Sequence, residues 1–262
     1  MKGFYAALYC ELLKIRRSKV FLATIVFFVF ISMMMGFLML VAKHPEVAEN
    51  SAILSTKASL IGTADWPSYF SLVLQLGLVL GVIGPGIVTV WVFGREYSDR
   101  VIKDILVLPV SRFKILSAKF VLVFLWSLLL LTVLYLTCIV SGFFVGLDGW
   151  EGNLFRLNFI AFFESALLMN LLVTPVALLT CVSRGYLLPF GFLILIMILT
   201  QFVFVGLEGL TPYFPWAIPA LITGVAGPDS PHADIFSYSI LALTTLAGFL
   251  GSAVWWRYAD HH

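Results

Sequence analysis

The sequence predicts an all-α integral membrane protein with six transmembrane helices in a single domain, residues 1–262. The chain is 61% hydrophobic and only 11% charged, with a mean hydropathy of +1.04, whereas soluble domains are roughly 45–50% apolar. Six apolar runs reach the about 20 residues that a helix needs to cross a bilayer. They do not alternate with period two, which favours helices over a β-barrel. The runs are residues 20–41, 69–93, 120–144, 157–182, 187–207 and 235–256.

Lysine and arginine predict the orientation, because cytoplasmic loops of membrane proteins carry an excess of them. Most of the 16 basic residues lie in 2–19 and 95–119, and Arg184 and Arg257 fall on the same predicted side. The first apolar run is too long for a signal peptide and reads as a retained span. We therefore expect a multi-pass protein of the cell membrane with both termini in the cytoplasm. The other side carries only three basic residues: Lys43, Lys57 and Arg156.

Residues 1–19 predict a helix that lies on the membrane surface. Apolar side chains recur along it at spacings of four and three: Phe4, Leu8, Leu12 and Ile15. Charged side chains share another face: Glu11, Lys14 and Arg17. Such a helix buries its apolar stripe at the acyl boundary and keeps its cations among the headgroups. The alternative is an ordinary basic flank that only fixes the topology.

Small residues punctuate the second predicted span. Gly77 and Gly81 form a small-xxx-small face that lets two helices approach closely, and Gly84-Pro85-Gly86 should kink the span. These residues predict a subunit interface or a hinge, or else ordinary packing within the bundle.

A charged segment, residues 94–112, separates the second and third apolar runs. Its charges alternate in sign, and Glu96 and Arg100 have the i,i+4 spacing of a helix-stabilising pair. Pro109 should end this helix, and Ser111 is placed to cap the next one. The pattern predicts a short helix parallel to the membrane that docks a partner. A solvated connector whose charges only enforce the topology is the alternative.

Polar residues inside the predicted spans are candidate pathway residues. Glu164 is the one acid well inside a span, and an intramembrane carboxylate is costly enough to suggest contact with a substrate or a proton. Snorkelling to the interface or pairing with a neighbouring helix are the alternatives. Gln75, Asn170 and Gln201 are weaker candidates, because such residues more often form interhelical hydrogen bonds than bind ligands.

Prolines interrupt residues 208–234, between the fifth and sixth apolar runs, and forbid a continuous helix there. Residues 213–222 are apolar enough to enter a membrane but too broken to cross it. They predict a re-entrant or interfacial hairpin on the outer side, or a loop anchored by aromatic belt residues. On the inner side, little more than Ser183-Arg184-Gly185 joins the fourth and fifth spans, so these helices should be antiparallel neighbours.

The sequence contains no signature of an enzyme, a metal site or a nucleic-acid interface. It has no HExxH, GxSxG or GxxxxGK(S/T) motif, so we expect no catalysis and no bound cofactor in this chain. Cys10, Cys138 and Cys181 lack the CxxC spacing of a zinc site. Nothing suggests a surface that reads bases. The terminal His261-His262 pair is native or the remnant of a purification tag.

Short motifs around the charged segment resemble a known family. Glu96-Tyr97 after an apolar span, Leu106-x-x-Pro109-Val110-Ser111-Arg112, and Ile115-Leu116-x-x-Lys119 are similar to the six-span permeases of the ABC type-2 exporter superfamily, including bacitracin-exporter-like permeases. Residues 11–19 look like the N-terminal elbow helix of these permeases. Many members carry Gly-Thr where this chain has Val101-Ile102, so the departure weakens any assignment to a subfamily.

The resemblance implies that residues 94–116 form a coupling helix on a separate cytoplasmic ATPase that binds ATP and Mg²⁺. Two permeases, identical or paralogous, would enclose the pathway, and the 24 Phe residues suit a lipophilic or amphipathic cargo. A secondary transporter, a channel or a structural subunit that works without ATP is the rival interpretation. The implied docking residues are Glu96, Arg100, Pro109, Ser111 and Arg112. The implied elbow residues are Glu11, Lys14, Arg16 and Arg17.

Overall fold

The computed structural model describes residues 2–44, 63–99, 110–225 and 230–258, together with residues 46 and 227. Apart from one isolated bridge between Asp65 and Asp148, every regular element in these residues is helical. In chain order the elements are α1 (Lys2–Arg16), α2 (Lys19–Lys43), α4 (Trp66–Ser98), α6 (Arg112–Val145), α7 (Gly152–Leu171), α8 (Thr174–Ser183), α9 (Leu187–Gly206), η2 (Glu208–Tyr213), α10 (Ile218–Ile222) and α11 (Ile235–Tyr258).

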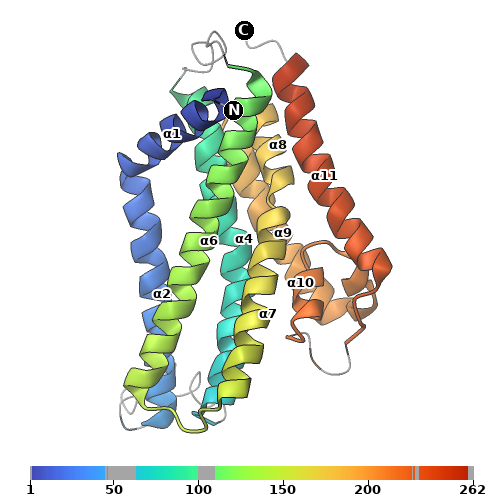
Figure 1. The fold of residues 1–262 in the computed structure, drawn as a ribbon. Coiled ribbons are helices and arrows are strands. Elements are labelled where there is room, and N and C mark those ends of the chain that lie inside the picture. Colours follow the sequence, from blue (N-terminus) through green and yellow to red (C-terminus); the bar gives the residue numbers. More distant parts are fainter. Residues whose placement is uncertain are drawn as a thin grey trace.

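The prediction of an all-α protein with six candidate spans is confirmed. Six helical stretches of the described chain are long and apolar enough to cross a membrane, with α7 and α8 together forming the fourth, Gly152–Ser183. The start of α1 and the end of α11 lie at one end of the bundle, and α1 runs across that end at an angle to α2 (Figure 1). The same end carries the last turns of α4, α8 and α11 and the first turns of α6. We call it the basic end, because basic residues of these turns lie there, among them Arg95, Arg112 and Arg257.

Two helices extend beyond their apolar runs. The predicted runs 69–93 and 120–144 lie within α4, Trp66–Ser98, and α6, Arg112–Val145. The start of α6 agrees with the prediction that Ser111 precedes this helix, since Ser111 occupies its N-cap position. No proline lies between Phe93 and Ser98, and α4 continues through Gly94, so the first residues of the charged segment extend this helix instead of starting a separate one. Residues 100–109 lie outside the described residues, and the helix predicted there stays a prediction.

The fourth span is broken, although the sequence predicted one run over 157–182. The break falls between α7 and α8, just before Pro175, which has no N–H to donate and clashes with the preceding turn. The hydroxyl of Thr174 donates to the carbonyl of Thr245 in α11 at 2.7 Å. Gly248 of α11 lies against the Thr174–Pro175 backbone, where even a Cβ atom would overlap it. The break is therefore a packing site for α11.

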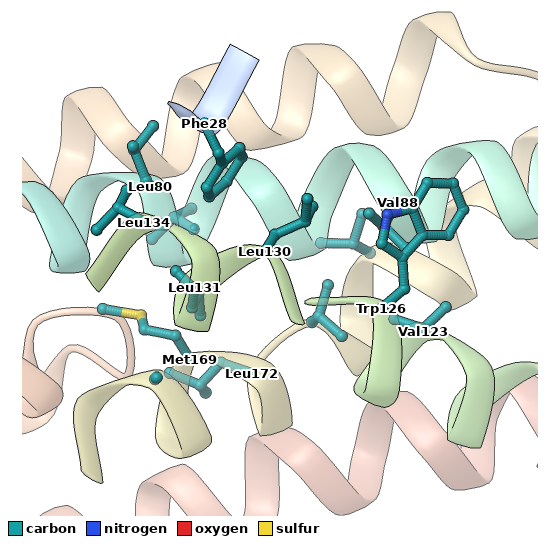
Figure 2. Close-up of a cluster of buried hydrophobic side chains, with 14 of the residues drawn as sticks. Phe28, Leu80, Val88, Val123, Trp126, Leu130, Leu131, Leu134, Met169 and Leu172 are labelled. Carbon is teal, nitrogen blue, oxygen red and sulfur yellow. The ribbon is translucent and has the colours of Figure 1, made fainter. Parts of the chain in front are cut away.

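The core of the bundle lies between α4, α6 and α7. Figure 2 shows Leu131 and Leu134 of α6 together with Leu80 of α4, Met169 of α7 and Leu172 just after α7 in one apolar cluster. Within an 18-residue apolar stretch of each helix, 67% of the residues are buried in α4, compared with 22% in α9 and 22% in α11. The central position of α4 and the apolar outer faces of α9 and α11 are what a lipid-embedded bundle requires.

The small-residue face of α4 is used inside the chain. A side chain at Gly77 would overlap the ring of Phe162, and one at Gly81 would press on Met169, both in α7. α4 and α7 therefore approach most closely through the predicted face, which supports packing within the bundle. α4 continues through Pro85 as one helix.

Residues 208–234 are broken into short elements, as the prolines predicted. The short helix α10 lies beside α7, and η2 contacts α9, α10 and α11, so neither lies beyond the lower ends of α2 and α6 (Figure 1). Trp216 and Ala220 line a cavity of about 90 Å³ together with Leu78 and Val82, which lie at the middle of α4. This segment therefore reaches the bundle at mid-length.

The break before Pro175 gives a test of the packing. Gly248→Ala should destabilise the protein by about 1–3 kcal/mol, because its Cβ forces α11 away from the backbone of α8. The matched control is Gly191→Ala in α9, where nothing lies within 4 Å of the added Cβ. Thermal unfolding of the purified protein in detergent measures both. Equal melting temperatures for the two variants would contradict this account of the α8–α11 contact.

Candidate functional site

Four charged side chains from three helices meet at the basic end. Lys119 Nζ of α6 lies 2.6 Å from Glu96 Oε1 of α4 and 3.4 Å from Glu11 Oε1 of α1. Lys14 Nζ of α1 lies 2.6 Å from Glu11 Oε1 and 3.1 Å from Glu96 Oε1. We call these four residues the charge cluster. Each ammonium group contacts both carboxylates, so the formal charges cancel within the cluster.

Three of the four residues of the charge cluster are buried, and Lys14 is partly exposed. Lys119 is 0% exposed, Glu96 2% and Glu11 5%. Burying a charge is expensive unless it is paired and hydrogen-bonded. Lys119 Nζ meets this condition with a further hydrogen bond to the carbonyl of Val92 at 3.3 Å. Glu96 meets it only in part, because its Oε2 atom has no hydrogen-bond partner among the described residues.

The pattern of α6 places Lys119 on a buried face. Ser111 occupies the N-cap position, and its carbonyl accepts bonds from the amides of Lys114 and Ile115, although its hydroxyl makes no capping bond. Ile115 and Leu122, one turn on either side of Lys119, are both buried. Since residues three and four apart share a helix face, Lys119 must point inward, toward the last turns of α4.

Glu11 also faces inward, which the sequence interpretation had wrong. That interpretation placed Glu11 on the polar face of α1. In the structure Glu11 is buried, as is Ile15 one turn further along. The ion pairs with Lys14 and Lys119 explain the difference, because they compensate a buried carboxylate that periodicity alone assigns to solvent.

The electrostatics of Glu11 follow from the same contacts. Burial alone would raise the pKa of Glu11, but attraction and hydrogen bonds from Lys119 and Lys14 outweigh it and hold the pKa below its ordinary value of 4.5. A carboxyl whose pKa is lowered by folding stabilises the fold above its unfolded pKa, and that contribution is lost as the pH falls through the lowered value. At neutral pH the contribution of Glu11 is fully present.

Two arginines flank the charge cluster. Arg95 lies over the ring of Trp91 at 5.0 Å, and its Nε donates to Asp99 Oδ2 at 3.3 Å. Arg112, in the first turn of α6, donates to the carbonyls of Trp256 and Arg257 at 3.0 and 3.3 Å. Basic side chains often stabilise such C-terminal carbonyls of a helix. Arg112 therefore joins the start of α6 to the end of α11.

The five predicted docking residues have different positions. Arg100 and Pro109 lie outside the described residues. Ser111 and Arg112 are exposed at the start of α6. Glu96 is buried in the charge cluster, and its side chain is therefore not exposed on the surface where a partner protein would bind. Its predicted i,i+4 pairing involves the undescribed Arg100, and the partners that the structure shows for it are Lys119 and Lys14.

The intramembrane polar residues are scattered over the bundle. Glu164 is exposed on α7, and Gln75 and Gln201 are exposed on α4 and α9. Asn170 is buried, and neither side-chain atom has a hydrogen-bond partner among the described residues. The Nε2 of Gln75 bonds only Ser71 on its own helix. None of the four forms an interhelical hydrogen bond in the described part of the chain.

Other residues form the interhelical hydrogen bonds. Tyr69 Oη of α4 bonds the carbonyl of Cys138 at 2.9 Å and lies 2.7 Å from Ser141 Oγ, both in α6. Trp256 Nε1 of α11 donates to Cys181 Sγ of α8 at 3.3 Å. An aromatic residue with a polar tip in an apolar run is the only signal that the sequence offers for these bonds.

No arrangement for a metal is present among the described residues. No group of three or more His, Cys, Asp and Glu side chains in them is placed to hold an ion. The three cysteines are free thiols, with Cys138 and Cys181 buried.

Comparison with known proteins identifies relatives over most of the chain. A family described as "ABC-2 family transporter protein" matches residues 7–200. The matched region runs from α1 into α9 and contains all four residues of the charge cluster. The chain is also similar to the bacitracin transport permease protein BCRB of Bacillus licheniformis. The two are 27% identical over 190 residues, which is 72% of this chain and 89% of that protein.

The charge cluster can be tested by removing one charge. Lys119→Met should destabilise the protein by about 3–5 kcal/mol, because it leaves two buried carboxylates with only Lys14 as a counter-ion. Lys114→Met is the matched control, since Lys114 is exposed in the first turn of the same helix. Thermal unfolding in detergent at neutral pH reports the difference. A Lys119→Met variant as stable as Lys114→Met would show that the cluster contributes little to stability.

Proposed function

This chain belongs to the ABC-2 transporter family, and we propose that it is the permease subunit of an ATP-driven exporter whose ATPase is a separate protein. It is a transport subunit and not an enzyme. Two such permeases, identical or paralogous, enclose the pathway, and two cytoplasmic ATPases bind ATP and Mg²⁺. The observation that carries this proposal is the charge cluster. It joins α1, α4 and α6 next to residues 100–112, the segment that a partner would have to move.

The position of the cluster supports coupling. Residues 100–109 connect the end of α4 to the start of α6, and Glu96 and Lys119 join those two helices just beyond the connection. Glu11 adds α1 to the same unit. A force applied to this connection therefore acts on α1, α4 and α6 together. Such a unit suits a transporter that converts ATPase closure into a tilt of its spans.

The docking surface is residues 100–112, with Arg100, Pro109, Ser111 and Arg112 as contacts on the ATPase. Glu96 does not contact the ATPase directly. Its buried carboxylate instead holds the end of α4 to α6, next to the docking surface. The basic end accordingly faces the cytoplasm. The excess of lysine and arginine at this end supports that orientation, as cytoplasmic segments carry such an excess.

The remaining elements fit the same assignment. α1 is the elbow helix, with Lys14, Arg16 and Arg17 at the level of the headgroups. Residues 208–234 form a re-entrant segment on the outer side, and the contact of Trp216 and Ala220 with mid-length α4 supports this.

Glu164 is the candidate pathway residue. It shares an exposed face of α7 with four apolar side chains: Leu157, Ile160, Leu167 and Leu171. A carboxylate surrounded by lipid is unfavourable, so this face of α7 meets water or the second permease during transport. The cargo is lipophilic or amphipathic. The aromatic-rich spans support this class of cargo.

Docking can be tested with charge reversals. Arg100→Glu should lower co-purification of the ATPase about tenfold or more, because a partner built for a cation then meets a carboxylate. The partner to use is a soluble ATPase with a GxxxxGK(S/T) loop encoded beside this chain. Arg156→Glu is the control, since Arg156 is exposed at the opposite end of the bundle. Co-purification that is unaffected by Arg100→Glu, or affected equally by Arg156→Glu, would contradict docking at residues 100–112.

The pathway assignment has its own test. Glu164→Gln should lower transport into inverted vesicles by about tenfold while leaving the melting temperature and ATPase binding unchanged, because Glu164 is exposed and unpaired among the described residues. Gln75→Leu on α4 serves as a second exposed polar position. If Glu164→Gln transports at the normal rate, Glu164 is not a pathway residue.

A further inference from the structure

A basic cavity lies beside the charge cluster, and the proposed function does not use it. Its volume is about 510 Å³, and it lies between α1, the last turns of α4 and the turn before α9. The side chains that define its chemistry are Lys14, Arg17, Trp91, Arg95, Asp99 and Tyr186. The cavity is therefore lined by cations and aromatic rings together.

The cavity carries net positive charge. Lys14 and Lys119 already compensate the deeper acids, Glu11 and Glu96. Of the remaining charges in the lining, Arg17 and Arg95 oppose the single carboxylate of Asp99. Only Nε of Arg95 bonds Asp99, and its terminal nitrogens have no hydrogen-bond partner in the described part of the chain. Arg17 has no ion pair among the described residues, whereas Arg95 is paired with Asp99 through its Nε. The guanidinium group of Arg17 and the terminal nitrogens of Arg95 can thus bind an anion.

The depth of the cavity indicates which anion is available. α1 crosses the end of the bundle, and the cavity includes Ser18, the N-cap of α2, where the chain turns into its first span (Figure 1). Trp91 and Tyr186 are the residue types that gather at membrane–water interfaces. Tyr9 and Leu12 are exposed on the neighbouring face of α1. The cavity therefore opens at the level of the lipid headgroups.

We propose that this cavity binds the phosphate headgroup of an anionic phospholipid. Guanidinium groups suit phosphate because their planar N–H donors match its oxygens. Basic pockets between helices on the cytoplasmic side of a membrane protein are suited to such headgroups. The lining also contains Leu13, Trp91 and Tyr186, which offer contact area to the glycerol and upper acyl carbons of a lipid. A free phosphate ion has no apolar part and could not form these apolar contacts.

The bound lipid would join α1 to α4 next to the charge cluster. Arg17 belongs to the turn between α1 and α2, whereas Arg95 belongs to α4. A headgroup held by both arginines bridges the two elements across the cavity. The composition of the surrounding leaflet would then tune the stability of the unit that contains the docking surface.

The test uses the full chain in detergent, with dioctanoyl phosphatidylglycerol as the probe. Dioctanoyl phosphatidylcholine and inorganic phosphate are the comparison ligands, and binding is read from the rise in melting temperature with ligand concentration. Arg17→Gln and Arg95→Gln should each weaken phosphatidylglycerol binding about tenfold. Arg16→Gln is the matched control, because Arg16 is an exposed neighbour of Arg17 that does not line the cavity.

Each outcome decides the proposal. Saturable stabilisation by phosphatidylglycerol that is lost in Arg17→Gln and Arg95→Gln but kept in Arg16→Gln supports it. Equal stabilisation by phosphatidylcholine would refute recognition of an anionic headgroup, and equal affinity for inorganic phosphate would refute a lipid as the ligand. Equal loss in all three variants would refute this cavity as the site. Melting temperatures without lipid check that each variant is folded.

Discussion

The rest of the basic end depends on the buried contact between Lys119 and Glu96. Removing either Lys119 or Glu96 would leave a buried charge without its counter-ion. The energetic cost of such a charge is far higher than that of breaking an ion pair on the surface. The same carboxylates hold Lys14, so α1 is fixed to α4 and α6 by the same constraint. An apolar contact could hold these helices equally well, but it would tolerate sliding. A charge cluster with each ammonium group between two carboxylates specifies one register.

A second set of contacts fastens the other side of the bundle. α11 packs on α8 through the hydrogen bond from Thr174 to Thr245, the close approach at Gly248, and the bond from Trp256 to Cys181. Arg112 links the two sides, since it begins α6 and bonds the last carbonyls of α11. The start of α6 therefore contacts both groups of helices, through Lys119 on one side and Arg112 on the other.

The spans could be predicted from the sequence because length and hydropathy alone decide whether a helix can cross a bilayer. The end of α4 could not, since this helix continues past its apolar run into the charged segment, whereas Ser111 did mark the start of α6. The break before Pro175 had a signal in the sequence, but its use by α11 did not. Glu11 shows the limit most clearly. Periodicity placed it in solvent, whereas a lysine more than 100 residues away draws it inside.

Lys119 illustrates why the candidate site was only half predicted. The sequence placed it correctly near the charged segment and within a family-like motif, yet treated its charge as a marker of topology. Its stripe with Ile115 and Leu122 indicated an inward side chain, which requires a buried acid nearby. Two acids, Glu11 and Glu96, fulfil that requirement, and both had been assigned to exposed surfaces. A buried lysine requires nearby acids, and the acids that pair with Lys119 come from α1 and α4. These ion pairs hold α1, α4 and α6 together as the unit on which docking would act.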